Sequence, residues 1–174
     1  VLEKIKKNIA SNSSEKIIFG ENYSYKKNAN GFIYKDKFGK MNLPIPNLLG
    51  DFQISNVTTA IAVAKNLDQF KITAPHIKKA ITKIRSEGRL QSITKGQLRK
   101  YVSKNNQILI DGAHNSLAAF EINKYLETLD AKRKIIMVIG MMANKEHKEF
   151  IQIFKNRVYS IIALDIPNQI NFIK

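Results

Sequence analysis

The chain has 174 residues, of which 25% are charged and 44% hydrophobic, proportions that are ordinary for a soluble globular protein. It contains no cysteine, which excludes a disulfide framework and a thiolate metal site. Its longest apolar run, residues 135–142, is far shorter than the roughly 18 residues that suggest a membrane span. We therefore expect no membrane partner and a cytoplasmic location. The first residues, VLEKIKKN, lack the apolar core of a secretory signal and begin with Val1, and we expect a piece of a longer protein.

The net charge of +15 suggests nucleic-acid binding, because Lys and Arg neutralise phosphates. Only 5 of the 29 cationic residues are Arg, the usual base reader and bidentate phosphate ligand. The lysines are also scattered along the chain. A compositional bias towards Lys, Ile and Asn explains the charge better, so we predict no nucleic-acid partner. A basic, non-enzymatic nucleic-acid-binding protein remains the alternative.

The first half opens with short β signals. Residues 17–20 and 23–27 are predicted strands, and GFIYKDKFGKMNL is predicted as a hairpin that turns at residues 35–37. After Gly50, apolar residues recur at helical spacing and predict a helix that ends around residue 66. A second helix is predicted from Thr73, whose hydroxyl can cap it.

The organisation changes near residues 86–90. LQSIT and QLRKYV are predicted as two short strands joined at Lys95-Gly96. Then come a strand at 108–110, a helix at 117–129, a strand at 135–139, a helix at 145–154 and a strand at 158–164. This alternation predicts βαβ units in a parallel sheet, and the continuous apolar strands predict that both sheet faces are covered. A doubly wound sheet would continue further, so this half also looks cut short.

Five residues between a predicted strand and helix, DGAHN at 111–115, carry polar groups that core packing does not need. In open parallel sheets, ligands bind outside the carboxyl ends of the strands, where Asp111 lies. Gly112 permits close backbone approach, and His114 and Asn115 begin a helix whose free N–H groups attract anions. A nucleotide or phosphorylated ligand would suit this place. Alternatively, Asn115 or Ser116 only caps the helix and Asp111 only orders a turn.

DGAHN resembles the signature of folylpolyglutamate synthases and dihydrofolate synthases, which are ATP-dependent amide ligases related to the Mur cell-wall ligases. Three further segments resemble family motifs in the same order: LPIPNLLGDFQISNVTTAIAVA, GRLQ and VIGMMANKE. The resemblance covers most of the chain from about Gly31 onwards. The chain departs from the family pattern at Phe52 (usually His), at Ser86-Glu87 (usually Trp-Pro) and at Ser116 (usually Pro).

The resemblance implies an α/β fold in two parts. Residues 1–87 would be the remainder of a Mur ligase central ATPase domain, with short strands and two helices. Residues 88–174 would be the first part of a truncated, Rossmann-like C-terminal domain. No G-x-x-x-x-G-K-[ST] P-loop occurs in the sequence. The phosphate-binding loop and the Mg²⁺ ligands of the family are therefore expected upstream of this chain.

By resemblance, the chain is part of a ligase of folate biosynthesis and one-carbon metabolism that adds glutamate to dihydropteroate or a tetrahydrofolate through an acyl phosphate. The implied cofactors are ATP and Mg²⁺. The implied partners are a folate or pteroate substrate, L-glutamate and an upstream P-loop-bearing fragment. We expect the isolated chain to be inactive, and a decayed ligase remnant is a further alternative.

The resemblance also implies roles for four residues. Asn56 would contact the adenine end of ATP, and Arg89 would reach ATP from the domain junction. Asp111 would orient Arg89 or bind the ribose, and His114 would lie beside the nucleotide. No catalytic residue and no metal ligand are assigned in this chain, and Lys145, which matches the family's lysine, receives no role.

Overall fold

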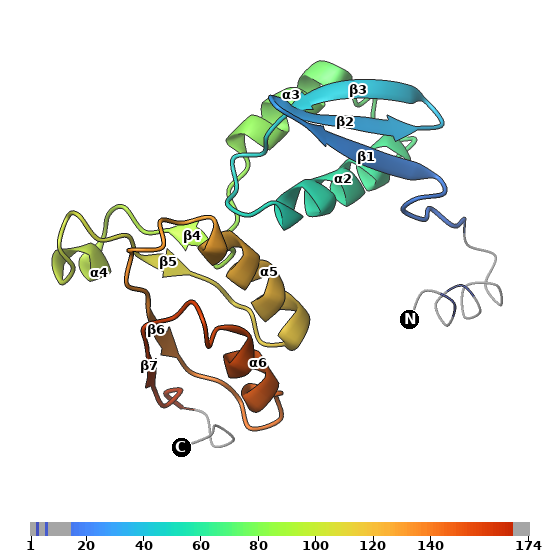
Figure 1. Cartoon of the computed structure of the whole chain (residues 1–174). Coiled ribbons are helices and arrows are strands. Elements are labelled where there is room, and N and C mark those ends of the chain that lie inside the picture. The colour runs from blue at the N-terminus through green and yellow to red at the C-terminus, as the bar shows by residue number, and fades with distance from the viewer. Residues whose placement is uncertain (1–2, 4–5, 7–14, 169–174) are drawn as a thin grey trace. The chain divides into compact units, whose positions relative to one another are not determined.

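The computed structural model describes residues 3, 6 and 15–168. These residues form two compact units. Unit 1 lies within Val1–Asn47 and Gln53–Ile84, and unit 2 comprises Leu48–Phe52 and residues within Arg85–Lys174. Each unit contains both helices and strands (Figure 1), which confirms the mixed α/β class expected from the sequence.

Unit 1 is built on a three-stranded antiparallel sheet of β1 (Tyr23–Asn28), β2 (Gly31–Asp36) and β3 (Gly39–Pro44), in that order. The predicted hairpin is confirmed. Its turn lies at residues 37–38 rather than 35–37, because Asp36 pairs with Gly39 across the ladder. The predicted strand at 17–20 is wrong, since that segment contributes only an isolated bridge from Phe19 to Tyr23.

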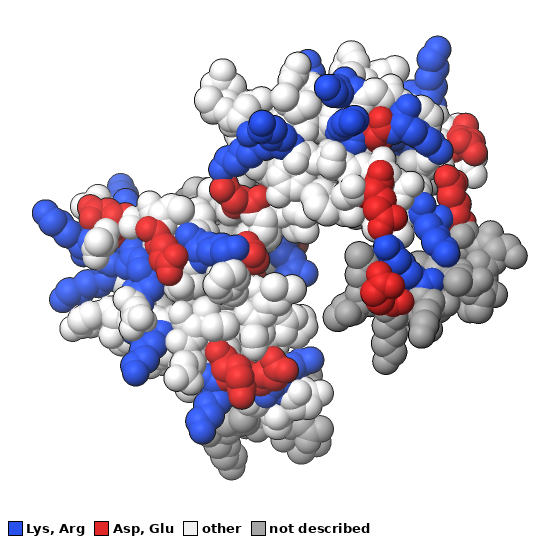
Figure 2. Space-filling model, turned by 45° about the vertical axis from the view of Figure 1, so that its right-hand side comes forward, with Lys and Arg blue, Asp and Glu red and all other residues white. Residues whose placement is uncertain are grey.

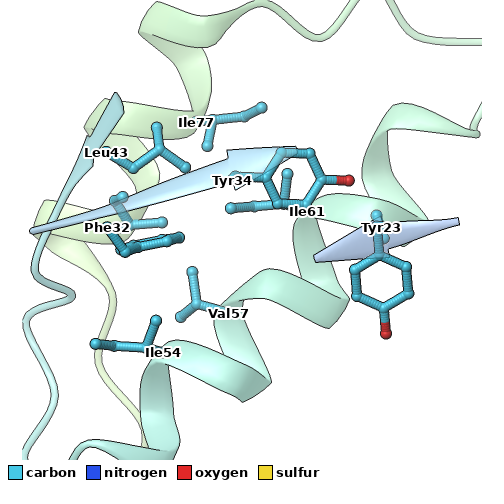
Figure 3. Packing of buried hydrophobic residues seen from close by; sticks show 10 residues of the cluster. Tyr23, Phe32, Tyr34, Leu43, Ile54, Val57, Ile61 and Ile77 are labelled. Carbon is cyan, nitrogen blue, oxygen red and sulfur yellow. The ribbon is translucent and has the colours of Figure 1, made fainter. Parts of the chain in front are cut away.

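Two helices cover one face of this sheet, namely α2 (Phe52–Lys65) and α3 (Ala74–Lys83), as the spacing of apolar residues predicted. Figure 3 shows the aromatic and aliphatic side chains of the strands meeting those of the helices. Thr73 precedes α3 as predicted, and its backbone N–H donates to His76 Nδ1 at 3.4 Å. The buried core of unit 1 consists of Tyr23, Phe32, Tyr34, Leu43, Ile54, Val57, Ile61, Ala62, Ile77 and Ile81.

A buried ion pair joins the sheet of unit 1 to the end of α2. Lys65 Nζ lies 2.8 Å from Asp36 Oδ2, and the side chains are 13% and 5% exposed. The Tyr34 hydroxyl donates to the same carboxylate oxygen at 2.9 Å. The Lys65 ammonium also lies 4.8 Å from the centre of the Phe38 ring. Because the charges are paired and hydrogen-bonded, their burial is tolerated.

This network makes the stability of unit 1 sensitive to alkaline pH. Burial, and secondarily the hydrogen bond to Asp36, raise the pKa of Tyr34 above its ordinary value. Above about pH 10 an unfolded tyrosine loses its proton while folded Tyr34 keeps it, so stability falls as the pH rises. We expect Tyr34→Phe to flatten this alkaline fall in urea unfolding between pH 8 and 11. The control Tyr101→Phe, at a residue that is 85% exposed, should keep the wild-type slope.

Unit 2 alternates strands and helices along the chain. Its two-stranded pairs are β4 with β5, which is antiparallel, and β6 with β7, which is parallel. The β6–α6–β7 connection confirms the predicted βαβ unit. The elements are β4 (Gln91–Ser92), α4 (Gln97–Lys100), β5 (Leu109–Ile110), α5 (Ser116–Glu127), β6 (Ile136–Ile139), α6 (His147–Ile153) and β7 (Ser160–Ala163).

The predicted strand QLRKYV is wrong, because its first residues form α4. Gln, Leu, Arg and Lys favour helix over strand, and Gly96, with φ of 96°, precedes the helix. The guanidinium of Arg99 donates to the carbonyls of Ser103 and Asn106 and closes the segment into a compact loop. The partner of β4 is therefore β5 rather than residues 97–102.

The core of unit 2 lies on one side of the parallel pair. Alternate residues of β6, Met137 and Ile139, pack against the cluster formed by α5 and α6. The other alternate residues, Ile136 and Val138, are 60% and 58% exposed. The expectation of a sheet covered on both faces is therefore wrong for the part of the chain that the structure describes. The buried residues of this core are Ala119, Leu126, Met141, Phe150 and Phe154.

The positive charge is dispersed over both units. On the face shown in Figure 2, Lys and Arg side chains lie over both units with Asp and Glu side chains among them. This distribution agrees with a compositional origin of the charge. Among the described residues, no helix is long and apolar enough to cross a bilayer.

Candidate functional site

The carboxylate of Asp111 lies just beyond β5 and accepts two backbone hydrogen bonds. Oδ2 accepts from the N–H of Leu90 at 2.7 Å, and Oδ1 accepts from the N–H of Ala113 at 2.8 Å. Bonds to an ionised acceptor are stronger than neutral ones. Asp111 therefore joins two loops that are 21 residues apart in the sequence.

The turn at residues 88–90 presents Arg89 beside this carboxylate. Gly88 has φ of 63°, and Leu90 has φ of 44°, a value in the left-handed region that costs a non-glycine residue about 1 kcal/mol or more. The Leu90 side chain is 3% exposed, so burial helps to hold this conformation. The N–H of Gly112 donates to the Gly88 carbonyl at 2.8 Å and ties the same loops together.

The guanidinium of Arg89 lies near the loop after β5. A methyl group placed on Gly112 would lie 4.0 Å from Arg89 Nη1, an ordinary van der Waals distance, which places the cation close to residue 112. Arg89 is exposed. Within the described residues, no ion pair joins Arg89 to Asp111, whose two oxygens face backbone N–H groups instead. The influence of Asp111 on Arg89 therefore runs through the backbone of Leu90.

The third predicted residue, His114, lies in the same loop. Its Nδ1 is 3.0 Å from the carbonyl oxygen of Gly112, which fixes the ring near the start of α5. Asn115 caps that helix by accepting from the N–H of Ala118 at 2.9 Å, so the capping interpretation of Asn115 is confirmed. The structure thus brings Arg89, Asp111 and His114 together at the N-terminus of a 12-residue helix.

The loop after β6 lies beside the same helix terminus. The hydroxyl of Ser116 donates to Glu146 Oε2 at 2.8 Å and joins this loop to α5. His147 Nε2 lies 2.8 Å from the Met142 carbonyl oxygen, which gives it a structural contact that the sequence did not suggest. Lys145 is partly buried in this loop. Ser116, one of the residues that departs from the family pattern, thereby links the loops that follow two successive strands.

The fourth predicted residue, Asn56, lies in unit 1 on the exposed side of α2. Its side-chain N–H donates to Gln53 Oε1 at 3.0 Å. Gln53 is 3% exposed, and its Nε2 has no hydrogen-bond partner within the described residues. An unpartnered buried amide is unfavourable and suits a site that a ligand acceptor completes. Sequence reasoning missed Gln53, although a polar residue within an apolar helix stripe was a usable signal.

Comparisons with known proteins identify similar sequences. The profile of the family described as dihydrofolate synthetase, C-terminal domain, matches residues 94–166. A dihydrofolate synthase/folylpolyglutamate synthase of Buchnera aphidicola subsp. Acyrthosiphon pisum is 27% identical over 106 residues, which are 61% of this chain and 23% of that protein. The corresponding protein of subsp. Schizaphis graminum is 25% identical over 118 residues, which are 67% of this chain and 25% of that protein.

Solved structures match over almost the whole chain. E. coli FolC in complex with ADP matches with a TM-score of 0.81 and 20% identity, covering 99% of this chain and 38% of FolC. A bifunctional folylpolyglutamate synthase/dihydrofolate synthase with Mn, AMPPNP and L-glutamate bound matches with a TM-score of 0.80 and 20% identity. The match covers 99% of this chain and 38% of that protein's chain. At such identities these likenesses establish the fold alone.

The chain therefore shares a mixed α/β fold with a portion of FolC. The family profile, the curated relatives and the solved structures together support its placement in the folylpolyglutamate synthase/dihydrofolate synthase family, in the region of the C-terminal domain. The chain spans about a quarter of the length of the curated relatives and about two fifths of the solved ones.

Proposed function

We propose that the chain is part of an ATP-dependent amide ligase that adds glutamate to dihydropteroate or a tetrahydrofolate through an acyl phosphate. Residues 1–87 would belong to the central ATPase domain and residues 88–174 to the C-terminal domain. The observation that carries the proposal is the assembly of Arg89, Asp111 and His114 at the start of α5, in a chain of this family. Solved relatives contain ADP, AMPPNP, L-glutamate or the ligand DHPP, which agrees with a nucleotide and a pteroate-type acceptor.

Each unit, taken by itself, offers groups that could contact a nucleotide. In unit 2, Arg89 supplies an exposed, permanently charged guanidinium suited to phosphate oxygens. In unit 1, Gln53 has a buried amide without a partner among the described residues, and Asn56 lies next to it and could make polar contacts to a base. Asp111 holds the Arg89 turn, and His114 borders the loop after β5. A bound nucleoside triphosphate would supply the phosphoryl group that activates the acceptor carboxylate.

The described residues do not provide a magnesium site. Among residues 3, 6 and 15–168, no group of three or more His, Asp or Glu side chains could hold a metal ion. The described residues therefore supply no Mg²⁺ ligand set. The Mg²⁺ ligands and the phosphate-binding loop would come from a P-loop-bearing segment or fragment of the same ligase.

The isolated chain is expected to show no ATP-dependent glutamate ligation. Without the lysine and backbone N–H groups of a P-loop, nothing neutralises the β and γ phosphates as charge shifts during phosphoryl transfer. The assay is incorporation of radiolabelled glutamate into dihydropteroate and tetrahydrofolate. Turnover of about 1 per second or more would overturn this expectation, because that is the ordinary range of enzymes.

A salt titration separates the ligase proposal from the basic-protein alternative. When a protein binds a DNA duplex through phosphate contacts, the logarithm of the binding constant falls linearly with the logarithm of the salt concentration. The slope is about −0.9 per neutralised phosphate. The ligase proposal predicts weak DNA binding that disappears at physiological salt. Sequence-selective binding that persists above about 0.2 M salt would instead favour the nucleic-acid-binding alternative.

A further inference from the structure

The turn that carries Arg89 is held by a residue to which the sequence analysis assigned no role. Gln91, the first residue of β4, directs its side chain back along the chain, and its Oε1 accepts from the N–H of Gly88 at 2.9 Å. Gln91 itself is fixed by pairing with Ile110 of β5 in the antiparallel ladder. The side-chain bond therefore anchors the turn to a regular element.

Both neighbours of Arg89 have their N–H groups bound by side chains. The N–H of Gly88 is bound by Gln91, and the N–H of Leu90 is bound by Asp111 at 2.7 Å. These neighbours also have the two positive φ angles of the turn, 63° and 44°. A turn with an unfavourable Leu90 conformation persists only when its surroundings fix it. The two side chains supply that constraint from opposite sides of Arg89.

We propose that Gln91 is a positioning residue for Arg89. By accepting the hydrogen bond from the Gly88 N–H, it keeps the turn in the conformation that places the guanidinium near Gly112, in the loop that precedes α5. It acts through the backbone and does not itself touch a ligand. The consequence for nucleotide affinity rests on the proposed function, whereas the effect on the turn does not.

The chemistry of the contact predicts which substitutions are tolerated. The bond needs an acceptor at the δ-carbon, so Gln91→Glu retains it, whereas Gln91→Met keeps the length of the side chain and removes the acceptor. Gln97→Met provides the matched control, because Gln97 is exposed at the start of α4. Loss of one such hydrogen bond corresponds to a change of roughly 2- to 13-fold in an equilibrium constant.

The test uses the full chain labelled with ¹⁵N, in wild-type form and as these three variants. The first readouts are hydrogen exchange of the Gly88 amide and relaxation of the Arg89 Nε–H group, both without nucleotide. We expect Gln91→Met to speed Gly88 exchange several-fold and to make Arg89 more mobile. Gln91→Glu and Gln97→Met should behave as the wild type does. The second readout is the affinity for MgADP, measured from changes in amide chemical shifts. We expect this affinity to fall several-fold in Gln91→Met and to keep its wild-type value in Gln97→Met.

The outcomes distinguish a failure of the proposed role of Gln91 from a failure of the proposed nucleotide site. If Gly88 exchange and Arg89 relaxation are unchanged in Gln91→Met, Gln91 is not a positioning residue. If Gln91→Met fails to fold, a Gln91→Glu protein with fast Gly88 exchange would refute the hydrogen-bond role, and a protected Gly88 would support it. If wild-type protein shows no shifts with millimolar MgADP, the proposed nucleotide site fails, while the exchange data still decide the role of Gln91.

Discussion

In a ligase that also includes a P-loop-bearing segment, Asp111→Asn is expected to lower kcat/KM for ATP by roughly 10- to 150-fold. The Asp111 carboxylate accepts from both Leu90 and Ala113, whereas an asparagine offers one acceptor oxygen and turns an N–H₂ group towards the other donor. Losing one charge-assisted hydrogen bond costs roughly 1.5–3 kcal/mol, and about 1.4 kcal/mol corresponds to tenfold. The Arg89 turn is then held less firmly to the loop after β5, although the bond from the Gly112 N–H to the Gly88 carbonyl remains.

The kinetic pattern identifies the role of Asp111. If the residue positions ATP, the loss appears mainly as a raised KM for ATP, and if it acts in the transition state, kcat falls instead. If Asp111 only shapes the turn, the melting temperature falls while the kinetics of the folded fraction stay nearly normal. Melting temperature and ATP kinetics are therefore measured on the same protein. Unchanged kinetics with a lowered melting temperature would remove Asp111 from the site.

Phe32→Ala should destabilise unit 1 by about 3–5 kcal/mol, the usual cost of removing a buried phenylalanine. Phe32 is 0% exposed at the centre of the core (Figure 3), and its ring meets that of Tyr25 edge to face at 6.3 Å. Such a loss is a large share of the stability of a small domain. Urea unfolding followed by the amide signals of β1–β3 measures it.

Phe38→Ala is the matched control for this prediction. Phe38 lies in the turn of the same hairpin and is 58% exposed, so its removal exposes no cavity. It contributes a cation–π contact with Lys65, whose side chain is 13% exposed, and such contacts are worth about 0.5–2 kcal/mol. Equal losses in the two variants would show that the core of unit 1 is not organised around Phe32.

Elements with a strong period or clear termini could be predicted from the sequence. The hairpin of β2 and β3, the helices α2 and α3, and the β6–α6–β7 unit all appear where the pattern placed them. These elements bury a continuous apolar stripe, and burial is what the pattern reports. The prediction of a strand at 97–102 was wrong because four helix-forming residues outweigh one apolar alternation. Arg99 also closes the loop through side-chain hydrogen bonds to the carbonyls of Ser103 and Asn106, which hydrophobic periodicity does not report.

The candidate site was partly predictable for a similar reason. Asp111 and His114 were found because several polar residues interrupt an apolar strand–helix pattern. Gln91 received no role because a single glutamine in a short strand has no periodic signature, whereas Gln53 interrupts the apolar stripe of α2 and could have been noticed. The hydrogen bonding of each requires coordinates. Gln91 binds a backbone N–H three residues away, and Gln53 has an unpartnered buried amide among the described residues.

Photolabelling of the full chain with 8-azido-ATP tests the nucleotide-binding proposal most directly. The proposal places the adenine end of the nucleotide at Asn56, so label should appear in the tryptic peptide of residues 41–65 and disappear with excess ATP. Asn56→Ala should reduce this labelling, and the neighbouring control Ser55→Ala should not. A different result would contradict a nucleotide site in this chain. In that result, excess ATP does not displace the label, and the label is spread over many lysine-containing peptides. It is also absent from residues 41–65 and from the peptide 105–124, which contains His114.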